Sequence, residues 1–425
     1  MTIATAIAIL IIAVMVWAMI KQYETKVVLI AGAIAMAVTA GQPGLLLASF
    51  SKSMKMTNVF EIIITSMAFA AVVKLTGCDR HLVAVFVKIL KKSGPFLMVG
   101  VALTTMVVNI SIPSAAGTSA TVGIVLIPLL ISAGVPAPLA AGTILCGLYG
   151  GNLNPGHVHP TIVADIAQKT GMDFVSLVSL PLIGSVVVSS SILMLVTLWM
   201  RKKRPNAFAE YTGDLSEVEA IQNMKINYLF VPIPLLPLIL LMLGNTYVPF
   251  LKMPVSHAMI IGSFVAMAAT LKSPIEISKA FFKGMGTSFG DIFGLIVCTT
   301  IFVETMQAVG LIKQLVDTMI ATPAIAKVSA IFGPFLVTLL SGSGEAVSIA
   351  LNKAVTVHAN QFGMEILNMG AMVVLSGGIG RSATILSACT IVCAGIAKVS
   401  PIQIIKYNWF AMVAALLFCA VTLDF

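Results

Sequence analysis

The chain has 425 residues, of which 59% are hydrophobic and only 10% are charged, and its mean hydropathy is +1.05. Soluble domains carry roughly 25% charged residues, so this composition excludes a soluble globular protein and indicates a membrane protein. The net charge of +9 does not indicate a nucleic-acid partner. The basic residues lie between the apolar runs, where membrane proteins carry them.

Apolar segments follow one another along the whole chain, and a transmembrane helix needs ~20 mostly apolar residues. In the first half the predicted spans are about 3–20, 26–40, 58–76, 136–165 and 174–200. In the second half they are about 228–245, 255–271, 290–309, 368–397 and 402–423. The first span lacks the basic start and small-residue cleavage site of a signal peptide, so we expect it to be retained. The sequence therefore predicts an all-α integral membrane protein in contact with the lipid bilayer.

Each half also contains two shorter apolar arms that are joined by a turn rich in Gly, Ser and Pro. The two pairs of arms cover about 94–134 and about 322–361. An arm of about 15 residues is too short to cross a hydrocarbon core of ~30 Å. We therefore predict a re-entrant hairpin in each half.

The two halves resemble each other in sequence. The segment from Pro43 to Met54 matches the segment from Pro274 to Met285, with Pro, Phe, Lys and Met in register. About five crossings in each half is an odd number, so the two repeats must be inverted in the membrane. We predict a first inverted repeat at 1–200, with a broken helix at about 136–165. A linker at 201–227 joins it to a second repeat at 228–425, with a broken helix at about 368–397.

Basic residues predict the orientation of these spans. Lys and Arg are concentrated in the loops that lie in the cytoplasm if the loop after Ile20 is cytoplasmic. This orientation also makes the linker at 201–227 cytoplasmic. The segment from Asp79 to Lys92 alternates apolar and basic positions, which predicts an amphipathic helix on the cytoplasmic face of the membrane.

Four polar segments interrupt the apolar runs, and they are paired across the two halves. They are 111–119 and 341–345 in the hairpin turns, and 150–160 and 376–382 in the broken helices. Hydrocarbon tolerates a broken helix only where protein or a water-filled cavity covers it, and paired breaks indicate the binding site of a transporter. The alternative is that their glycines and serines merely allow helices to pack closely.

These interruptions favour an anionic substrate. A helix that restarts after a break presents free N–H groups and the positive end of its dipole. The candidate substrate-binding residues are Ser114, Thr118, Ser119, Asn152, Asn154, His157, Ser343, Arg381 and Ser382. Carbonyl groups freed by unwinding can coordinate a small cation. The candidates for coupling to Na⁺ or H⁺ are Ser111, Gly151, Asn152, Glu345 and Gly378.

Arg381 is the most informative single residue, because an arginine within a membrane span needs a partner. A substrate carboxylate can supply it through a bidentate pair. The alternative partner is Glu345 at the second hairpin turn, which would form a structural ion pair. Lys353, on the returning arm of that hairpin, fits either role.

The sequence predicts neither a metal site nor an organic cofactor. His157 and His159 form an H-x-H pair without enough neighbouring ligands for a metal, and we expect them to line the cavity or to bind a carboxylate when protonated. The six cysteines contain no CxxC pair, so we interpret them as packing residues. An intramembrane enzyme is not expected, because the histidines lack a nucleophile partner.

At the interruptions the sequence resembles a known family. The stretches from Ile112 to Ser119, from Gly150 to Gly156 and from Ser376 to Ser382 are similar to motifs of the anaerobic C4-dicarboxylate carrier family, the DcuC family, within the ion transporter superfamily. Neither hairpin turn carries the Ser-Asn-Thr of better-known members of that superfamily.

The resemblance implies a secondary transporter of succinate, fumarate or malate in the bacterial inner membrane. It implies alternating access with efflux, exchange or ion-coupled transport, and a homodimer in which a scaffold holds a mobile transport region. The open alternatives are a carrier of the same superfamily for another carboxylate or an amino acid, and an anion channel.

Overall fold

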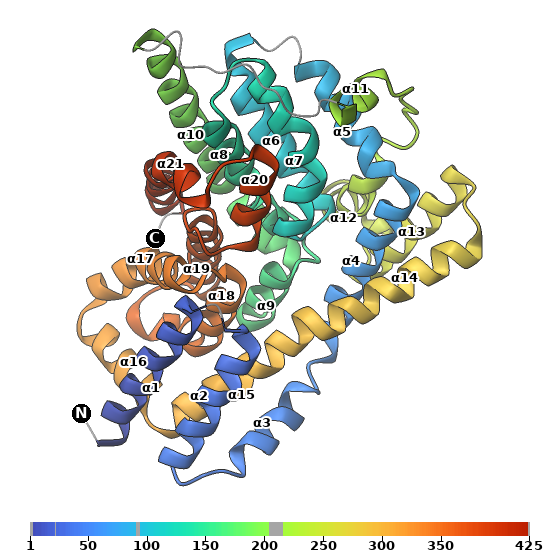
Figure 1. Ribbon diagram of the computed structural model, residues 1–425. Coiled ribbons are helices and arrows are strands. Elements are labelled where there is room, and N and C mark those ends of the chain that lie inside the picture. The colour runs from blue at the N-terminus through green and yellow to red at the C-terminus, as the bar shows by residue number, and fades with distance from the viewer. Residues whose placement is uncertain (1–2, 22, 91–93, 204–215, 424–425) are drawn as a thin grey trace.

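The computed structural model describes residues 3–21, 23–90, 94–203 and 216–423, and within these ranges the chain forms helices and no strands (Figure 1). Among the described residues, five helices are long and apolar enough to cross a membrane: 59–76, 115–132, 171–202, 274–308 and 401–422. Further apolar helices of 10–17 residues accompany them. The prediction of an all-α membrane protein is confirmed.

The first half contains ten α-helices in its described residues. They are α1 (Ile3–Ile20), α2 (Thr25–Thr39), α3 (Leu45–Ser53), α4 (Thr57–Thr76), α5 (Cys78–Leu90), α6 (Leu97–Ser111), α7 (Ala115–Ser132), α8 (Ala137–Gly147), α9 (Val158–Ala167) and α10 (Gly171–Lys203). The end of α4 is dictated by Gly77, whose φ of 73° is the left-handed conformation that glycine adopts without strain. The amphipathic helix predicted at 79–92 is present as α5, and its last two residues lie outside the described part.

The described part of the second half repeats this order after a short additional helix, α11 (Ser216–Asn223). It continues with α12 (Leu236–Thr246), α13 (Val255–Thr270), α14 (Pro274–Ser288), α15 (Gly294–Ala308), α16 (Leu311–Ala321), α17 (Pro323–Ser341), α18 (Gly344–Ala354), α19 (Ile366–Arg381), α20 (Ala388–Ala397) and α21 (Pro401–Thr422). Gly310 separates α15 from α16 with a φ of 77°, as Gly77 does between α4 and α5. Residues 204–215 of the predicted linker lie outside the described ranges.

Two predicted spans differ from the helices that form. The segment predicted as a span at 228–245 becomes helical only at Ile233. A 3₁₀ turn, Ile233–Leu235, leads into α12, because Pro232 and Pro234 lack the N–H groups that a regular α-helix needs there. The span predicted at 290–309 begins much earlier. A π-helical turn, Phe289–Phe293, joins α14 to α15 in one long helix, which Figure 1 shows crossing the molecule diagonally. Its α14 part packs along α4 and its α15 part along α2.

Two helix pairs occupy the positions predicted for the hairpins. Helices α6 and α7 meet at a turn where the Ser114 hydroxyl accepts a hydrogen bond from Gly117 N (3.3 Å). Helices α17 and α18 meet at Gly342, which has a φ of 74°, and the Ser343 hydroxyl accepts from Ala346 N (3.4 Å). In both pairs a serine therefore caps the returning helix.

The two broken helices interrupt at different points of their motifs. After α8 the chain forms a 3₁₀ turn, Gly150–Leu153, and returns to α-helix at α9, as predicted. The prediction that Ser376–Ser382 is unwound is wrong up to Arg381, because α19 continues through the glycines and the break begins only at Ser382. Close packing explains these glycines, since a Cβ atom on Gly380 would lie 2.9 Å from the Phe335 carbonyl oxygen.

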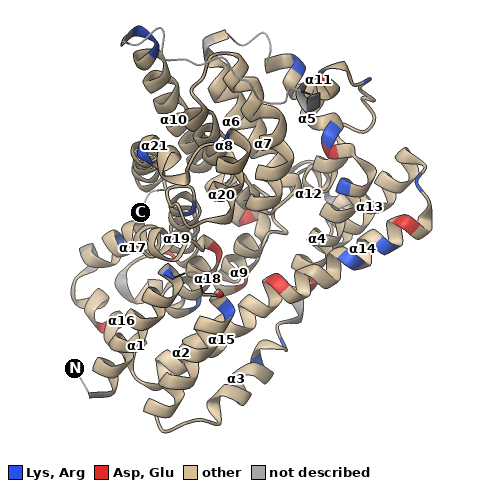
Figure 2. Cartoon of the chain, viewed as in Figure 1, with Lys and Arg blue, Asp and Glu red and all other residues tan. Residues whose placement is uncertain are grey.

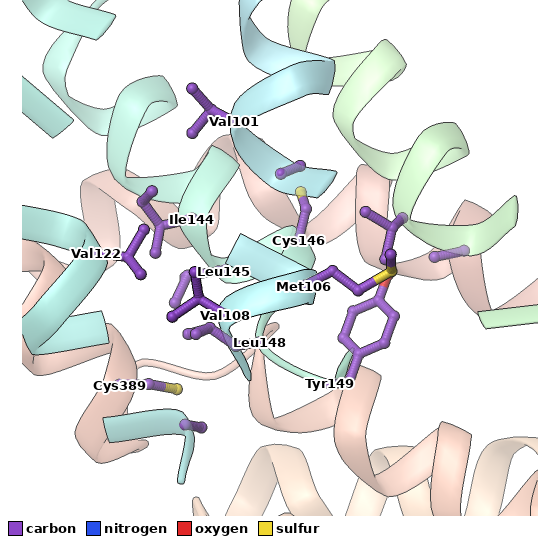
Figure 3. Packing of buried hydrophobic residues seen from close by; sticks show 14 of the residues in the cluster. Val101, Met106, Val108, Val122, Ile144, Leu145, Cys146, Leu148, Tyr149 and Cys389 are labelled. Atoms are coloured by element: carbon purple, nitrogen blue, oxygen red, sulfur yellow. The ribbon is translucent and has the colours of Figure 1, made fainter. Parts of the chain in front are cut away.

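The largest apolar core joins α6, α7, α8 and α10 to α19, α20 and α21. Figure 3 shows part of this core around Tyr149, with Met106 and Cys146 nearby. A second cluster lies among α1, α2 and α15–α18. Most of the ribbon of both clusters is tan in Figure 2, whereas α14, which belongs to neither cluster, contains residues coloured as charged.

Candidate functional site

A cavity of about 450 Å³ lies between the two hairpin turns. It is bounded by the start of α7, by the α17–α18 turn, by the break between α19 and α20, and by the loop that joins α1 to α2. The residues that line it include Tyr23, Glu24, Ser114, Ser343, Glu345 and Arg381. Segments that are far apart in the sequence, and that carry three of the four polar interruptions, therefore meet at one place.

Arg381 ends α19 beside this cavity, and its side chain is 14% exposed. Its Nη1 donates to Glu345 Oε1 at 3.1 Å, and its Nη2 donates to the carbonyl oxygen of Leu148 at 3.0 Å. Its Nε is buried without a hydrogen-bond partner. The alternative partner Glu345 is thus present in the structure, and the guanidinium still has one donor that nothing satisfies.

The turn of the first hairpin is held by Asn109, which the sequence analysis missed. Its Nδ2 donates to the carbonyl oxygen of Ile112 (3.0 Å) and to Thr118 Oγ1 (3.1 Å). Its Oδ1 accepts from Gly151 N (2.7 Å), which ties the hairpin turn to the first broken helix. Thr118 and Gly151, both predicted to be site residues, are therefore engaged with Asn109. The available signal was that Asn109 is the only amide side chain in α6.

The first broken helix contains one asparagine that supports the loop and one that is left unsatisfied. Asn154 donates to the Ile110 carbonyl oxygen (2.8 Å) and accepts from Gly156 N (2.8 Å), so both ends of its amide are engaged. Asn152 is 3% exposed, and its Oδ1 has no hydrogen-bond partner. Gly378 of α19 faces it, since a Cβ atom on that glycine would lie 3.6 Å from Asn152 Nδ2.

The histidine pair lies behind the cavity lining. His157 and His159 are 7% and 6% exposed, and their ring centroids are 5.1 Å apart. His157 Nδ1 is buried without a hydrogen-bond partner. Neither histidine is among the lining residues of this cavity, and their role in lining a substrate path or binding a carboxylate stays a prediction.

Several of the predicted serines hold the architecture instead of facing the cavity. Ser382 Oγ donates to the Leu145 carbonyl oxygen (2.9 Å), and the Ser382 carbonyl accepts from Asn408 Nδ2 (2.6 Å), so this residue fixes the second break to α8 and α21. Ser119 donates to the Ala115 carbonyl oxygen of its own helix. Ser114 and Ser343, by contrast, lie in the cavity wall.

Lys353 is separate from this site. Its Nζ donates to Thr300 Oγ1 at 2.5 Å and lies 3.7 Å from the Met56 sulfur. It sits at the opposite end of α18 from Glu345 and is absent from the cavity lining. The structure therefore gives Lys353 neither of its two predicted roles, substrate contact or partner of Glu345.

Several predicted site residues carry buried polar atoms without hydrogen-bond partners. Four of them are Ser111 Oγ, Asn152 Oδ1, His157 Nδ1 and Arg381 Nε. Buried polar groups are nearly always paired, so such a group of unpaired acceptors and donors is typical of a place that water, an ion or a ligand completes.

The chain is similar to known transporters. A family model described as "C4-dicarboxylate anaerobic carrier" (DcuC) matches residues 1–424. An uncharacterized transporter of Haemophilus influenzae is 34% identical over 280 residues, which cover 63% of this chain and 98% of the relative. The anaerobic C4-dicarboxylate transporter DcuC of Escherichia coli is 21% identical over 354 residues, which cover 80% of this chain and 74% of the relative.

A solved structure shows the same fold. The crystal structure of the Alcanivorax borkumensis YdaH transporter matches with a TM-score of 0.59 at 15% sequence identity, and the match covers 89% of this chain and 86% of that one. The apolar helices, the fold of a transporter and the family match together identify a multi-pass membrane transporter and not an enzyme. The chain belongs to the DcuC family of anaerobic C4-dicarboxylate carriers.

Proposed function

We propose that this protein is a secondary active transporter that moves C4-dicarboxylates such as succinate, fumarate and malate across the bacterial inner membrane by alternating access. The observation that carries the proposal is Arg381 in the wall of the cavity between the hairpin turns, with a buried Nε that has no partner. A carboxylate of the substrate is the group that would satisfy this donor.

The dicarboxylate specificity rests on a second source of positive potential. The first turns of α7 and α18 begin at the cavity, and the N–H groups of an α-helix's first turn attract anions. Ser114 and Ser343 add a hydroxyl at each turn. We infer that one carboxylate of the substrate contacts Arg381 and the other lies near a hairpin turn.

The membrane topology follows from two inverted repeats, 1–200 and 228–425. With the loop after α1 in the cytoplasm, the cavity wall formed by Tyr23 and Glu24 lies on the cytoplasmic side. A second cavity, of about 340 Å³, is lined by Lys169 and Lys252, which this topology assigns to the outer face. We expect the protein to work as a homodimer.

A small cation is the expected coupling ion, and the site contains oxygen atoms suited to hold Na⁺. Ser111 Oγ and Asn152 Oδ1 are buried acceptors without partners. They lie on either side of the contact between the first hairpin and the first broken helix, which Asn109 joins. Proton coupling is the alternative, and transport assays with a Na⁺ gradient or a pH gradient distinguish the two ions.

Counterflow in proteoliposomes tests the proposal. Vesicles loaded with unlabelled succinate should take up labelled succinate in a saturable manner. Fumarate and malate should compete, whereas monocarboxylates and amino acids should not. Dependence on external Na⁺ or on a pH gradient would identify the ion. Absence of counterflow for every dicarboxylate would refute the function, and fast, non-saturable flux without counterflow would indicate a channel.

A further inference from the structure

We propose that the Glu345 carboxylate is a built-in substitute for the substrate: it holds Arg381 while the cavity is empty, and it releases Arg381 when a substrate carboxylate arrives. This inference rests on the proposed function and adds to it the way in which the empty carrier remains neutral at its site. It makes Glu345 a competitor of the substrate and not a contact for it.

Arg381 and Glu345 are held unequally by their other contacts. Arg381 is anchored from both sides, since it ends α19 and donates through Nη2 to the Leu148 carbonyl oxygen of the chain that follows α8. Among the described residues, Arg381 is the one hydrogen-bond partner of the Glu345 carboxylate, through a single contact of 3.1 Å. The arginine is therefore fixed, whereas the carboxylate is held at one point.

The two side chains also differ in their exposure. The Glu345 side chain is 31% exposed and that of Arg381 is 14% exposed. Both line the cavity, so the carboxylate is the more open of the two groups. A strong buried arginine–carboxylate pair is usually bidentate, but here Nε stays unpaired. A small anion entering the cavity can thus offer Arg381 a better set of contacts than Glu345 provides.

Among the described residues, no cation other than Arg381 forms an ion pair with Glu345. Glu24, across the cavity, accepts from Val27 N (2.8 Å) and lies 3.8 Å from Lys26. On the helices that pack against α18, Lys52 pairs with Glu304 of α15, and Lys353 of α18 itself bonds to Thr300. When the substrate takes Arg381, the Glu345 carboxylate, which is 31% exposed, therefore turns to the open part of the cavity.

The physical consequence concerns the return of the empty carrier. An unpaired arginine inside a membrane protein is costly, and breaking a buried ion pair is strongly unfavourable. A carrier without Glu345 would have to move an unpaired Arg381 through its closed state whenever no substrate is bound. With Glu345, the empty carrier closes on a neutral pair, so it can return alone and support net transport.

The test is Glu345→Gln in proteoliposomes, measured by two assays on the same preparation. Without the competing carboxylate, the apparent KM for succinate in counterflow should fall about tenfold, the equivalent of ~1.4 kcal/mol. Net efflux into succinate-free medium, which needs empty return, should fall at least about tenfold relative to counterflow. Glu304→Gln is the matched control, because it breaks an ion pair that lies outside the cavity and should leave that ratio unchanged.

An unchanged or higher KM in folded Glu345→Gln, or equal losses of efflux and counterflow, would overturn the inference and make the pair purely structural. If Glu345→Gln does not fold, Glu345→Asp decides the matter. Its shorter side chain weakens the contact with Arg381, so the same two changes should appear in smaller measure, and their absence overturns the inference. Failure of the proposed function is recognised separately, because wild-type protein would then show no counterflow at all.

Discussion

Replacing Asn109 with alanine removes the side chain that joins the first hairpin turn to the first broken helix. The change deletes hydrogen bonds to the Ile112 carbonyl, to Thr118 Oγ1 and from Gly151 N, at 3.0, 3.1 and 2.7 Å. Each is worth ~1 kcal/mol net, and a buried group left unpaired costs ~1–3 kcal/mol more. Thr118 keeps its bond to the Ile112 carbonyl (2.9 Å), so the Gly151 N–H is the main group left unpaired. The free energy of unfolding should fall by about 4 to 6 kcal/mol.

Denaturant titration of the purified protein in detergent measures this loss. Asn360→Ala is the matched control, because that side chain is exposed in the 3₁₀ segment Thr356–Phe362 and should change stability by less than ~0.5 kcal/mol. Asn109→Asp, which keeps the acceptor for Gly151 N but has no donor, should destabilise at least as much as alanine. A fall in the free energy of unfolding of less than ~1 kcal/mol for Asn109→Ala would show that this side chain does not hold the two interruptions together.

Two further predictions concern packing and pH. Gly150→Ala places a Cβ atom 2.6 Å from the Met106 carbonyl oxygen and should cost ~1–3 kcal/mol in the same titration. Gly395→Ala, with open space around its Cβ atom, should leave the free energy of unfolding unchanged or raise it. An equal loss of stability in Gly150→Ala and Gly395→Ala would contradict this explanation by packing. Burial lowers the pKa of His81, whose Nδ1 accepts from Asn227 N at 3.1 Å. Its contribution to stability is therefore complete above the usual histidine pKa of 6.5 and is lost as the pH falls below it. The free energy of unfolding should be lower at pH 5.5 than at pH 7.5, and this decrease should be smaller in His81→Gln than in wild type. An identical decrease in both proteins would exclude His81 as its source.

The long helices could be predicted from the sequence because their apolar runs end at charges or turn residues. The predicted spans 3–20 and 402–423 are α1, Ile3–Ile20, and α21, Pro401–Thr422. The broken helix at 136–165 was also expected, since Gly150, Gly151 and Pro155 disfavour a continuous helix. These features are local, so sequence pattern was sufficient.

The second break could not be located in this way. Ser376–Gly380 has the composition of an unwound segment, yet it is helical because its glycines receive neighbouring backbone and side chains. A glycine that permits unwinding and a glycine that permits close packing look alike in one sequence. The continuous helix through Phe289–Phe293 was missed for a related reason, since packing of α14 on α4 and of α15 on α2 is a tertiary effect.

The candidate site was predicted in part. Ser114, Ser343, Glu345 and Arg381 do meet in one cavity, as paired polar interruptions of apolar segments indicate. The sequence offered no means of deciding that Thr118, Asn154 and Ser382 would turn to backbone partners. It marked Asn109 only as the one amide side chain of α6, and the role of that residue depends on the nearness of α6 to Gly151.

The most direct test of the account is counterflow of labelled succinate with Arg381→Gln beside Arg201→Gln. Arg201 is also an arginine bound to backbone carbonyls, those of Ala133 and Gly134, but it lies outside the cavity. We expect saturable counterflow for wild type and Arg201→Gln, and a loss of apparent affinity of about 100-fold or more for folded Arg381→Gln. Unchanged affinity in Arg381→Gln would contradict the claim that this arginine binds the carboxylate substrate.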